Sequence, residues 1–287
     1  MIRQEDGMST LYISDLDGTL LGDDSRLSEE TIDKLNCLIE GEVDFVIATA
    51  RNYPSAYERV RHLKYKNYLI LSNGAQITKI DGTPVWIARM DNTLIEELFA
   101  FSGEFATSFI WTSLKGENKV MTHRDPSDAI LVFKAFREKY SPQAFLPFEG
   151  LHELLLEDII TVTMLDTHEK TREMEKRLME SPLSEKVDAH LMPYPELDGL
   201  FTLSILPKAT NKGAAIKELL RLTGKEPSSI VAFGDNENDK TMFKVADVGV
   251  AVGNANPALM EKADLVIGSN DESSVARYIW EAEHEKK

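Results

Sequence analysis

The stretch Leu11-Tyr12-Ile13-Ser14-Asp15-Leu16-Asp17-Gly18-Thr19 sets the fold that this sequence predicts. Its apolar residues run directly into two aspartates separated by one residue, and Gly18 ends the run. A short apolar segment that stops at a glycine is typical of a buried strand. Because side chains alternate along a strand, we expect Asp15 and Asp17 to leave its carboxyl end on one side.

Two carboxylates this close repel each other, and a neighbouring cation allows both to stay ionised. Mg²⁺ prefers oxygen ligands of this kind. We therefore predict a magnesium-dependent reaction centre at the end of this strand, in preference to a simple turn.

The N-terminal region continues with strands separated by helical patterns. The expected elements are a helix at 28–39, a strand at 43–48, a helix at 54–63 and a strand at 68–71. Strands joined by helices over short connections predict a parallel sheet with right-handed crossovers. In such sheets chemistry gathers at the carboxyl ends of the strands, where Thr49 and Asn73 fall.

The pattern changes after this region. A hairpin is predicted around Asp81-Gly82, and from about residue 87 to residue 206 helical and strand-like segments mix without a second parallel series. This predicts an inserted α+β domain. Its expected helices lie near 92–101, 127–140 and 168–179, and its expected strands near 107–112, 159–165, 187–192 and 201–206.

The strand and helix pattern resumes after Pro207. A helix from about Asn211 precedes a strand at 229–233, which ends in Gly234-Asp235-Asn236-Glu237-Asn238-Asp239. The predicted fold class is therefore α/β, with a doubly wound, mainly parallel sheet and an inserted α+β cap. We expect residues 1–86 and 207–287 to form a catalytic core and residues 87–206 the cap that selects the substrate.

The polar groups expected at the strand ends suit phosphoryl transfer. They are Asp15, Asp17, Thr49, Asn73, Asp235, Asn238 and Asp239, with Lys212 at the start of a nearby helix. A phosphoryl group needs cations and hydrogen-bond donors around its oxygens, and an aspartate can accept it covalently. For Asn73, a role confined to the turn and a contact with the substrate remain equally open.

These motifs resemble those of the haloacid dehalogenase (HAD) superfamily. The resemblance lies in Asp15-Leu16-Asp17-Gly18-Thr19, Thr49, Lys212 and residues 234–239. Ser72-Asn73-Gly74-Ala75, Gly253-Asn254-Ala255 and the placement of the cap resemble the Cof-type, sugar-phosphatase-like branch. The resemblance implies a HAD-like Rossmannoid core.

The resemblance also implies a role for each matched residue. Asp15 is expected to attack phosphorus, and Asp17 to serve as general acid and then as general base. Mg²⁺ is expected on Asp15, Asp235 and the backbone carbonyl of Asp17. The remaining expectations are phosphate binding by Leu16, Thr49, Ala50 and Lys212, support of the metal by Asn238 and Asp239, and a candidate substrate contact at Asn73.

The expected function is hydrolysis of small phosphorylated metabolites, such as sugar phosphates, through an aspartyl-phosphate. A phosphotransferase or phosphomutase of the same fold, and a catalytically idle metabolite-binding protein, are the alternatives.

The composition limits the partners. With 287 residues, 43% of them apolar, the chain can bury the cores of two domains. The net charge of −16 argues against nucleic acid. No apolar run reaches the roughly 18 residues of a membrane span, and residues 1–7 lack the apolar region of a signal peptide, so a cytoplasmic location is expected. The single cysteine, Cys37, is expected to be a buried thiol, and the oligomeric state stays open.

Overall fold

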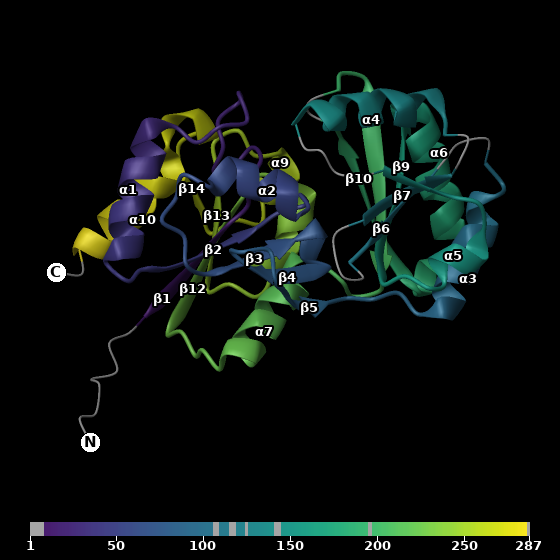
Figure 1. Cartoon of the computed structure of the whole chain (residues 1–287). Helices are drawn as coiled ribbons and strands as arrows, with labels where there is room; N and C mark the ends of the chain where they lie inside the picture. Colours follow the sequence, from purple (N-terminus) through teal and green to yellow (C-terminus); the bar gives the residue numbers. More distant parts are fainter. Residues whose placement is uncertain are drawn as a thin grey trace. The chain divides into compact units, whose positions relative to one another are not determined.

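The computed structural model describes residues 9–105, 109–114, 119–123, 126–140, 145–194 and 197–285, so the polar segment 1–7 lies outside the described residues. Two compact units form the chain (Figure 1). The first contains residues 1–86 and 211–287, and the second contains residues 87–210.

An eight-stranded sheet forms the centre of the first unit, in the order β14-β13-β12-β1-β2-β3-β4-β5. Neighbouring strands from β14 to β3 are parallel, and β4 runs antiparallel to β3. The strands are β1 (Thr10–Ser14), β2 (Asp44–Ala48), β3 (Tyr68–Leu71), β4 (Gln76–Lys79), β5 (Pro84–Ile87), β12 (Ser229–Gly234), β13 (Val248–Ala251) and β14 (Leu265–Val266).

Helices cover both faces of this sheet, because the central strands are apolar on both sides (Figure 1). On β1, Tyr12 packs with one helical layer and Leu11 and Ile13 with the other. The first layer contains α1 (Glu29–Glu40), α2 (Tyr53–Val60), α9 (Pro257–Met260) and α10 (Ser274–Glu285). The second layer contains α7 (Lys212–Thr223) and α8 (Lys240–Phe243). Short 3₁₀ helices η1 (Ser72–Gly74), η3 (Glu237–Asp239) and η4 (Asn270–Glu272) follow strand ends.

The second unit contains a six-stranded sheet in the order β10-β11-β9-β6-β7-β8. Its pairs are antiparallel except β7 with β8. The strands are β6 (Phe109–Ser113), β7 (Lys119–His123), β8 (Phe145–Phe148), β9 (Ile159–Thr167), β10 (Val187–Pro193) and β11 (Leu200–Pro207). The helices are α3 (Asn92–Ser102), α4 (Asp128–Tyr140), α5 (Leu151–Leu154), α6 (His168–Glu180) and the 3₁₀ helix η2 (Pro182–Glu185).

One large apolar cluster holds this unit together. The buried Trp111 lies in it with residues of α3, α5 and α6, whereas Ile130 of α4 packs with Ile110 and Val120 in a separate cluster. The two clusters use alternate residues of β6, so helices pack against both faces of this sheet as well.

Most expected elements are present within a few residues of their expected ends, and the predicted α/β fold is confirmed. The sequence pattern missed β7, β8 and α5. Pro147 lies inside β8, and proline is tolerated there because β8 is the edge strand of its sheet. The expectation for Cys37 was wrong: this thiol is exposed, because the buried stripe of α1 runs through Leu35 and Leu38.

In the described part of the chain, no helix has the length and apolar character needed to cross a bilayer.

Candidate active site

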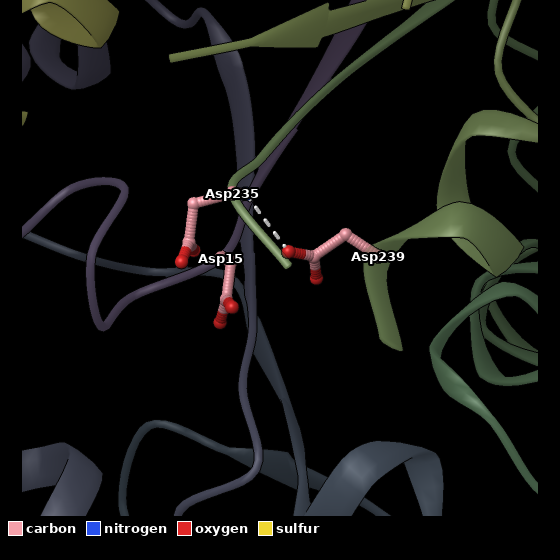
Figure 2. Close-up of side chains that lie close together, drawn as sticks. All are labelled: Asp15, Asp235 and Asp239. Carbon is pink, nitrogen blue, oxygen red and sulfur yellow. Dashed lines mark hydrogen bonds between the residues drawn. The ribbon is translucent and has the colours of Figure 1, made fainter. Parts of the chain in front are cut away.

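Two neighbouring strand ends bring the aspartates of the site together. Strand β1 pairs with β12 so that Ser14 faces Phe233, and the N–H of Asp15 donates to the carbonyl of Phe233 at 3.0 Å. Asp15 and Asp235 therefore emerge beside each other. One carboxylate oxygen from each of Asp15, Asp235 and Asp239 lies within 4.8 Å of the others (Figure 2).

Lys212 connects two of these carboxylates. Its Nζ lies 2.9 Å from Oδ2 of Asp15 and 2.7 Å from Oδ1 of Asp239, and its side chain is fully buried. The residue opens α7, where the side chain of Asn211 caps the helix by accepting from the N–H of Ala214. The first residue of this helix thus places a buried ammonium group beside the carboxylates at the strand ends.

The carboxylate of Asp239 shapes the loop after β12. Its Oδ2 accepts from the backbone N–H groups of Asp235 and Asn236, both at 3.0 Å, and its Oδ1 accepts from Lys212. Both oxygens are therefore engaged, which suits Asp239 to orient its neighbours rather than to bind a ligand directly.

The turn after β1 is built around Asp235. The hydroxyl of Thr19 donates to Oδ1 of Asp235 at 2.7 Å. Gly18 has a positive φ of 71°, and a Cβ atom there would lie 2.7 Å from Oδ2 of Asp235. Glycine is required at this position because neither the backbone conformation nor the space admits a side chain.

Burial and mutual repulsion perturb these groups. Burial, followed by the charge of Asp239, raises the pKa of Asp15 well above its usual range. The same two causes raise the pKa of Asp235 to about 7. Burial opposes the charge on Lys212, but Asp15 and Asp239 raise its pKa above the ordinary value, so it stays a cation.

Asp17 is paired with a residue that the sequence analysis did not single out. Nε and Nη2 of Arg51 donate to the two carboxylate oxygens of Asp17 at 2.7 and 2.6 Å. Arg51 follows Thr49 by two residues at the end of β2, and this position beside a strand end was the available signal.

The expected phosphate ligands surround the same strand ends. Leu16 directs its N–H to Oδ1 of Asp15 at 2.6 Å. Thr49 is buried just beyond β2, the neighbour of β1, and its hydroxyl oxygen accepts from the N–H of Arg51 at 3.2 Å. Ala50 follows as an exposed residue.

Asn73 and Asn238 form a buried amide pair. Nδ2 of Asn238 donates to Oδ1 of Asn73 at 3.0 Å, while Oδ1 of Asn238 is buried with no hydrogen-bond partner among the described residues. Asn73 has a positive φ of 53°, a conformation that asparagine tolerates better than most residues. The carboxamide oxygen of Asn238 is therefore an acceptor that the described residues leave unused.

The chain resembles known proteins over most of its length. The model of the haloacid dehalogenase-like hydrolase family matches residues 12–279. An "HMP-PP phosphatase" of Yersinia pseudotuberculosis is 26% identical over 276 residues, which cover 95% of this chain and 94% of that protein.

Solved structures share the fold. A Thermotoga maritima protein matches with a TM-score of 0.77 at 24% identity, over 96% of this chain and 97% of its own. A HAD subclass IIB sugar phosphatase matches with a TM-score of 0.73 at 21% identity, over 94% and 97% of the two chains. These findings confirm the predicted family and fold: the chain belongs to the haloacid dehalogenase-like hydrolase family.

Proposed function

We propose that this protein is a Mg²⁺-dependent phosphatase of small phosphorylated metabolites that works through an aspartyl-phosphate on Asp15. The observation that carries the proposal is the buried contact between Asp15 and Lys212 beside Asp235. It combines a nucleophile, a fixed cation and a second carboxylate in one place. Relatives named as phosphatases, including a HAD subclass IIB sugar phosphatase, support the same reaction class.

In the first step, a carboxylate oxygen of Asp15 attacks phosphorus, and the bond between phosphorus and the ester oxygen breaks. Asp17 gives its proton to the departing oxygen. In the second step, Asp17 takes a proton from water, the water oxygen bonds to phosphorus, and the bond from Asp15 to phosphorus breaks. The products are the alcohol, inorganic phosphate and free Asp15.

The phosphoryl oxygens need donors and a cation around them. We assign these roles to Lys212, the hydroxyl of Thr49 and the backbone N–H groups of Leu16 and Ala50. Lys212 suits this task because its raised pKa keeps it charged throughout the physiological range.

The donor set fits a divalent cation. When all four are ionised, the carboxylates of Asp15, Asp17, Asp235 and Asp239 carry four negative charges, against two positive charges from Lys212 and Arg51. A hard divalent cation would balance the remainder, and Mg²⁺ prefers such oxygen ligands. We propose Asp15, Asp235 and the backbone carbonyl of Asp17 as its ligands, with Asn238 and Asp239 in support.

Bound Mg²⁺ would offset the repulsion between the carboxylate of Asp15 and an anionic phosphate. The buried, unsatisfied oxygen of Asn238 is consistent with an additional positive group or a metal-bound water nearby.

Substrate selection is assigned to the second unit, from about residue 87 to residues 206–210. We propose sugar phosphates and related phosphorylated metabolites as the substrate class. Asn73, in the first unit, is a further candidate for a contact with the substrate. Its Oδ1 accepts from Asn238, which leaves its NH₂ group to donate to an oxygen of the substrate.

The test is release of inorganic phosphate from a panel of phosphorylated metabolites, with and without Mg²⁺, by the wild-type protein and the variant Asp15→Asn. We expect Mg²⁺-dependent release by the wild type and loss of at least about 10³-fold in the variant. Transfer to a sugar acceptor without free phosphate would instead identify a phosphotransferase. Equal activity in wild type and Asp15→Asn would refute the role of Asp15.

A further inference from the structure

We infer that Arg51 is a positioning residue that holds Asp17 in the orientation needed for proton transfer to the leaving oxygen. This inference rests on the proposed phosphatase function and adds a residue that the four matched motifs do not include.

The contact between the two side chains fixes both the place and the plane of the carboxylate. Nε of Arg51 donates to Oδ2 of Asp17 at 2.7 Å, and Nη2 donates to Oδ1 at 2.6 Å. Two parallel bonds of this kind define a single orientation, which one bond to a lysine could not do. The side chain of Arg51 is 11% exposed and that of Asp17 is 31% exposed, so solvent competes only partly with the pair.

Arg51 is itself held on other sides. Its Nη1 donates to the hydroxyl of Ser55 in the first turn of α2 at 2.8 Å. Its backbone N–H donates to the hydroxyl oxygen of Thr49 at 3.2 Å. These contacts hold Arg51 against the end of β2 and the start of α2. Through its bonds to Asp17, Arg51 then fixes the turn that follows β1.

The arrangement separates Asp17 from the other acids. Among the described residues, the carboxylates that converge as a possible metal group are those of Asp15, Asp235 and Asp239, and Asp17 is not one of them. Each carboxylate oxygen of Asp17 accepts one bond from Arg51 and keeps a second lone pair for proton transfer, while the backbone carbonyl of Asp17 is left for the metal. This division of roles within one residue is what Arg51 would maintain.

Arg277, in the same unit, makes a comparable ion pair away from the site. Arg277 makes a pair of the same type with Glu30, with bonds of 2.8 and 2.7 Å, but both side chains lie on the exposed surface of α10 and α1. Such a surface pair contributes little to stability and touches no group of the site. Arg277→Gln is therefore a matched control for Arg51→Gln.

The experiment compares kcat/KM for phosphate esters whose leaving groups differ in basicity. The value of kcat/KM reports the steps up to departure of the leaving group. We use 4-nitrophenyl phosphate, whose phenolate departs without a proton, and phenyl phosphate, which is similar in size but needs the acid more. The proteins are the wild type, Arg51→Gln, Arg51→Lys, Asp17→Asn, the double variant Arg51→Gln/Asp17→Asn and the control Arg277→Gln.

We expect Arg51→Gln to lower kcat/KM for phenyl phosphate by about 10- to 100-fold more than for 4-nitrophenyl phosphate, because a misplaced acid forfeits part of the roughly 10²- to 10⁴-fold that acid catalysis supplies. Asp17→Asn should show the same dependence on the leaving group, and adding Arg51→Gln to it should cost little more. Arg51→Lys should recover part of the loss, and Arg277→Gln should match the wild type.

An equal loss on both esters, or independent losses in the double variant, would overturn the role of Arg51 while leaving the phosphatase function intact. If Arg51→Gln fails to fold by circular dichroism, Arg51→Lys decides the question by the same comparison. An inactive wild type on every ester would reject the proposed function itself, so the two failures are distinguishable.

Discussion

The side-chain nitrogen of Lys212 lies 2.9 Å from Oδ2 of Asp15, and the two residues are only 1% and 5% exposed. An ion pair buried to this extent is costly to break, because the remaining partner keeps its charge away from water. The same pair places a cation beside the proposed nucleophile. Stability and catalysis should therefore fail together when Lys212 is lost.

Replacement of Lys212 by methionine tests this connection. Lys212→Met leaves the buried carboxylates of Asp15 and Asp239 without their common partner, and we expect a loss of about 3 kcal/mol in the free energy of unfolding. Phosphatase activity should fall to background. Urea denaturation and phosphate release measure the two effects.

The control is Lys240→Met, which removes a lysine from an exposed pair with Glu237. It should change stability by less than about 1 kcal/mol and leave activity intact. A Lys212→Met protein as stable as this control would contradict the buried pairing.

Asp17→Asn separates metal binding from proton transfer. Because the backbone carbonyl is the proposed ligand at this position, the variant should bind Mg²⁺ with an affinity close to that of the wild type. Turnover should fall by about 10²- to 10⁴-fold, since the amide cannot act as acid or base. Titration calorimetry and steady-state kinetics measure the two quantities. A collapse of metal affinity would show that the carboxylate, not the backbone, holds the metal.

Stability in the absence of metal should depend on pH through Asp235. In the folded protein the pKa of Asp235 is raised from 3.8 to about 7. A carboxyl group with a raised pKa binds its proton more tightly in the folded state than in the unfolded state. The free energy of unfolding therefore falls as pH rises between these two values, and the full loss is reached above about pH 7. Between pH 5.5 and pH 8 the expected loss from this group is about 2 kcal/mol.

Urea denaturation in EDTA at the two pH values measures this loss in the wild type and in Asp235→Asn. The variant should lose less stability than the wild type over the same interval, because its side chain at this position does not titrate. Millimolar Mg²⁺ should restore the wild type at pH 8, since a ligand that binds only the folded state stabilises it. Equal pH dependence in the two proteins would exclude Asp235 as the source.

Gly74 sets the distance between the turn after β3 and the start of α7. A Cβ atom at Gly74 would lie 2.3 Å from the carbonyl oxygen of Asn211, and its φ of 94° is unfavourable for other residues. Gly74→Ala should therefore displace Lys212 and destabilise the fold by more than about 2 kcal/mol, with a marked loss of activity.

Gly224 offers the matched control, because its φ of 64° is also positive but no atom lies within 4 Å of an added Cβ. Gly224→Ala should cost only the backbone strain, about 1 kcal/mol, and leave the activity unchanged. Thermal unfolding and phosphate release compare the two variants. Similar behaviour of both would mean that the close approach at Gly74 relaxes without consequence.

The first unit was largely predictable because its signals are local. Apolar strands that end in Asp15, Thr49, Asn73 and Asp235 fix a parallel sheet, and the topology of such a sheet brings these ends to one edge. The structure also brings Lys212 to Asp15, although the lysine is far along the chain. The roles assigned to these residues remain predictions.

What the sequence did not reveal depends on contacts between distant segments. The pairing of Arg51 with Asp17 joins two strand ends, and no periodicity encodes it. In the second unit, β7 and β8 are short, so their sequence patterns are weak. Pro147 also argues against a strand at β8 unless that strand lies at the edge of the sheet, as it does here. The position of Cys37 on α1 was misjudged because neighbouring leucines mark a face of the helix that the cysteine does not share.

Asn73 is the position at which a single atom decides between the two readings left open by the sequence. Asn73→Asp preserves the oxygen that accepts from Asn238 and tolerates the positive φ, but it replaces the NH₂ donor by an oxygen. If the donor binds the substrate, KM should rise by at least about tenfold, and inhibition by inorganic phosphate should weaken. Because Asn73 is only 3% exposed, the new carboxylate should also lower the free energy of unfolding by about 2 kcal/mol. The control is Asn36→Asp on α1. Among the described residues, the amide of Asn36 bonds to the backbone of His62 and Lys64, so this variant adds the same charge and should leave KM unchanged. An unchanged KM in Asn73→Asp would confine this residue to the turn.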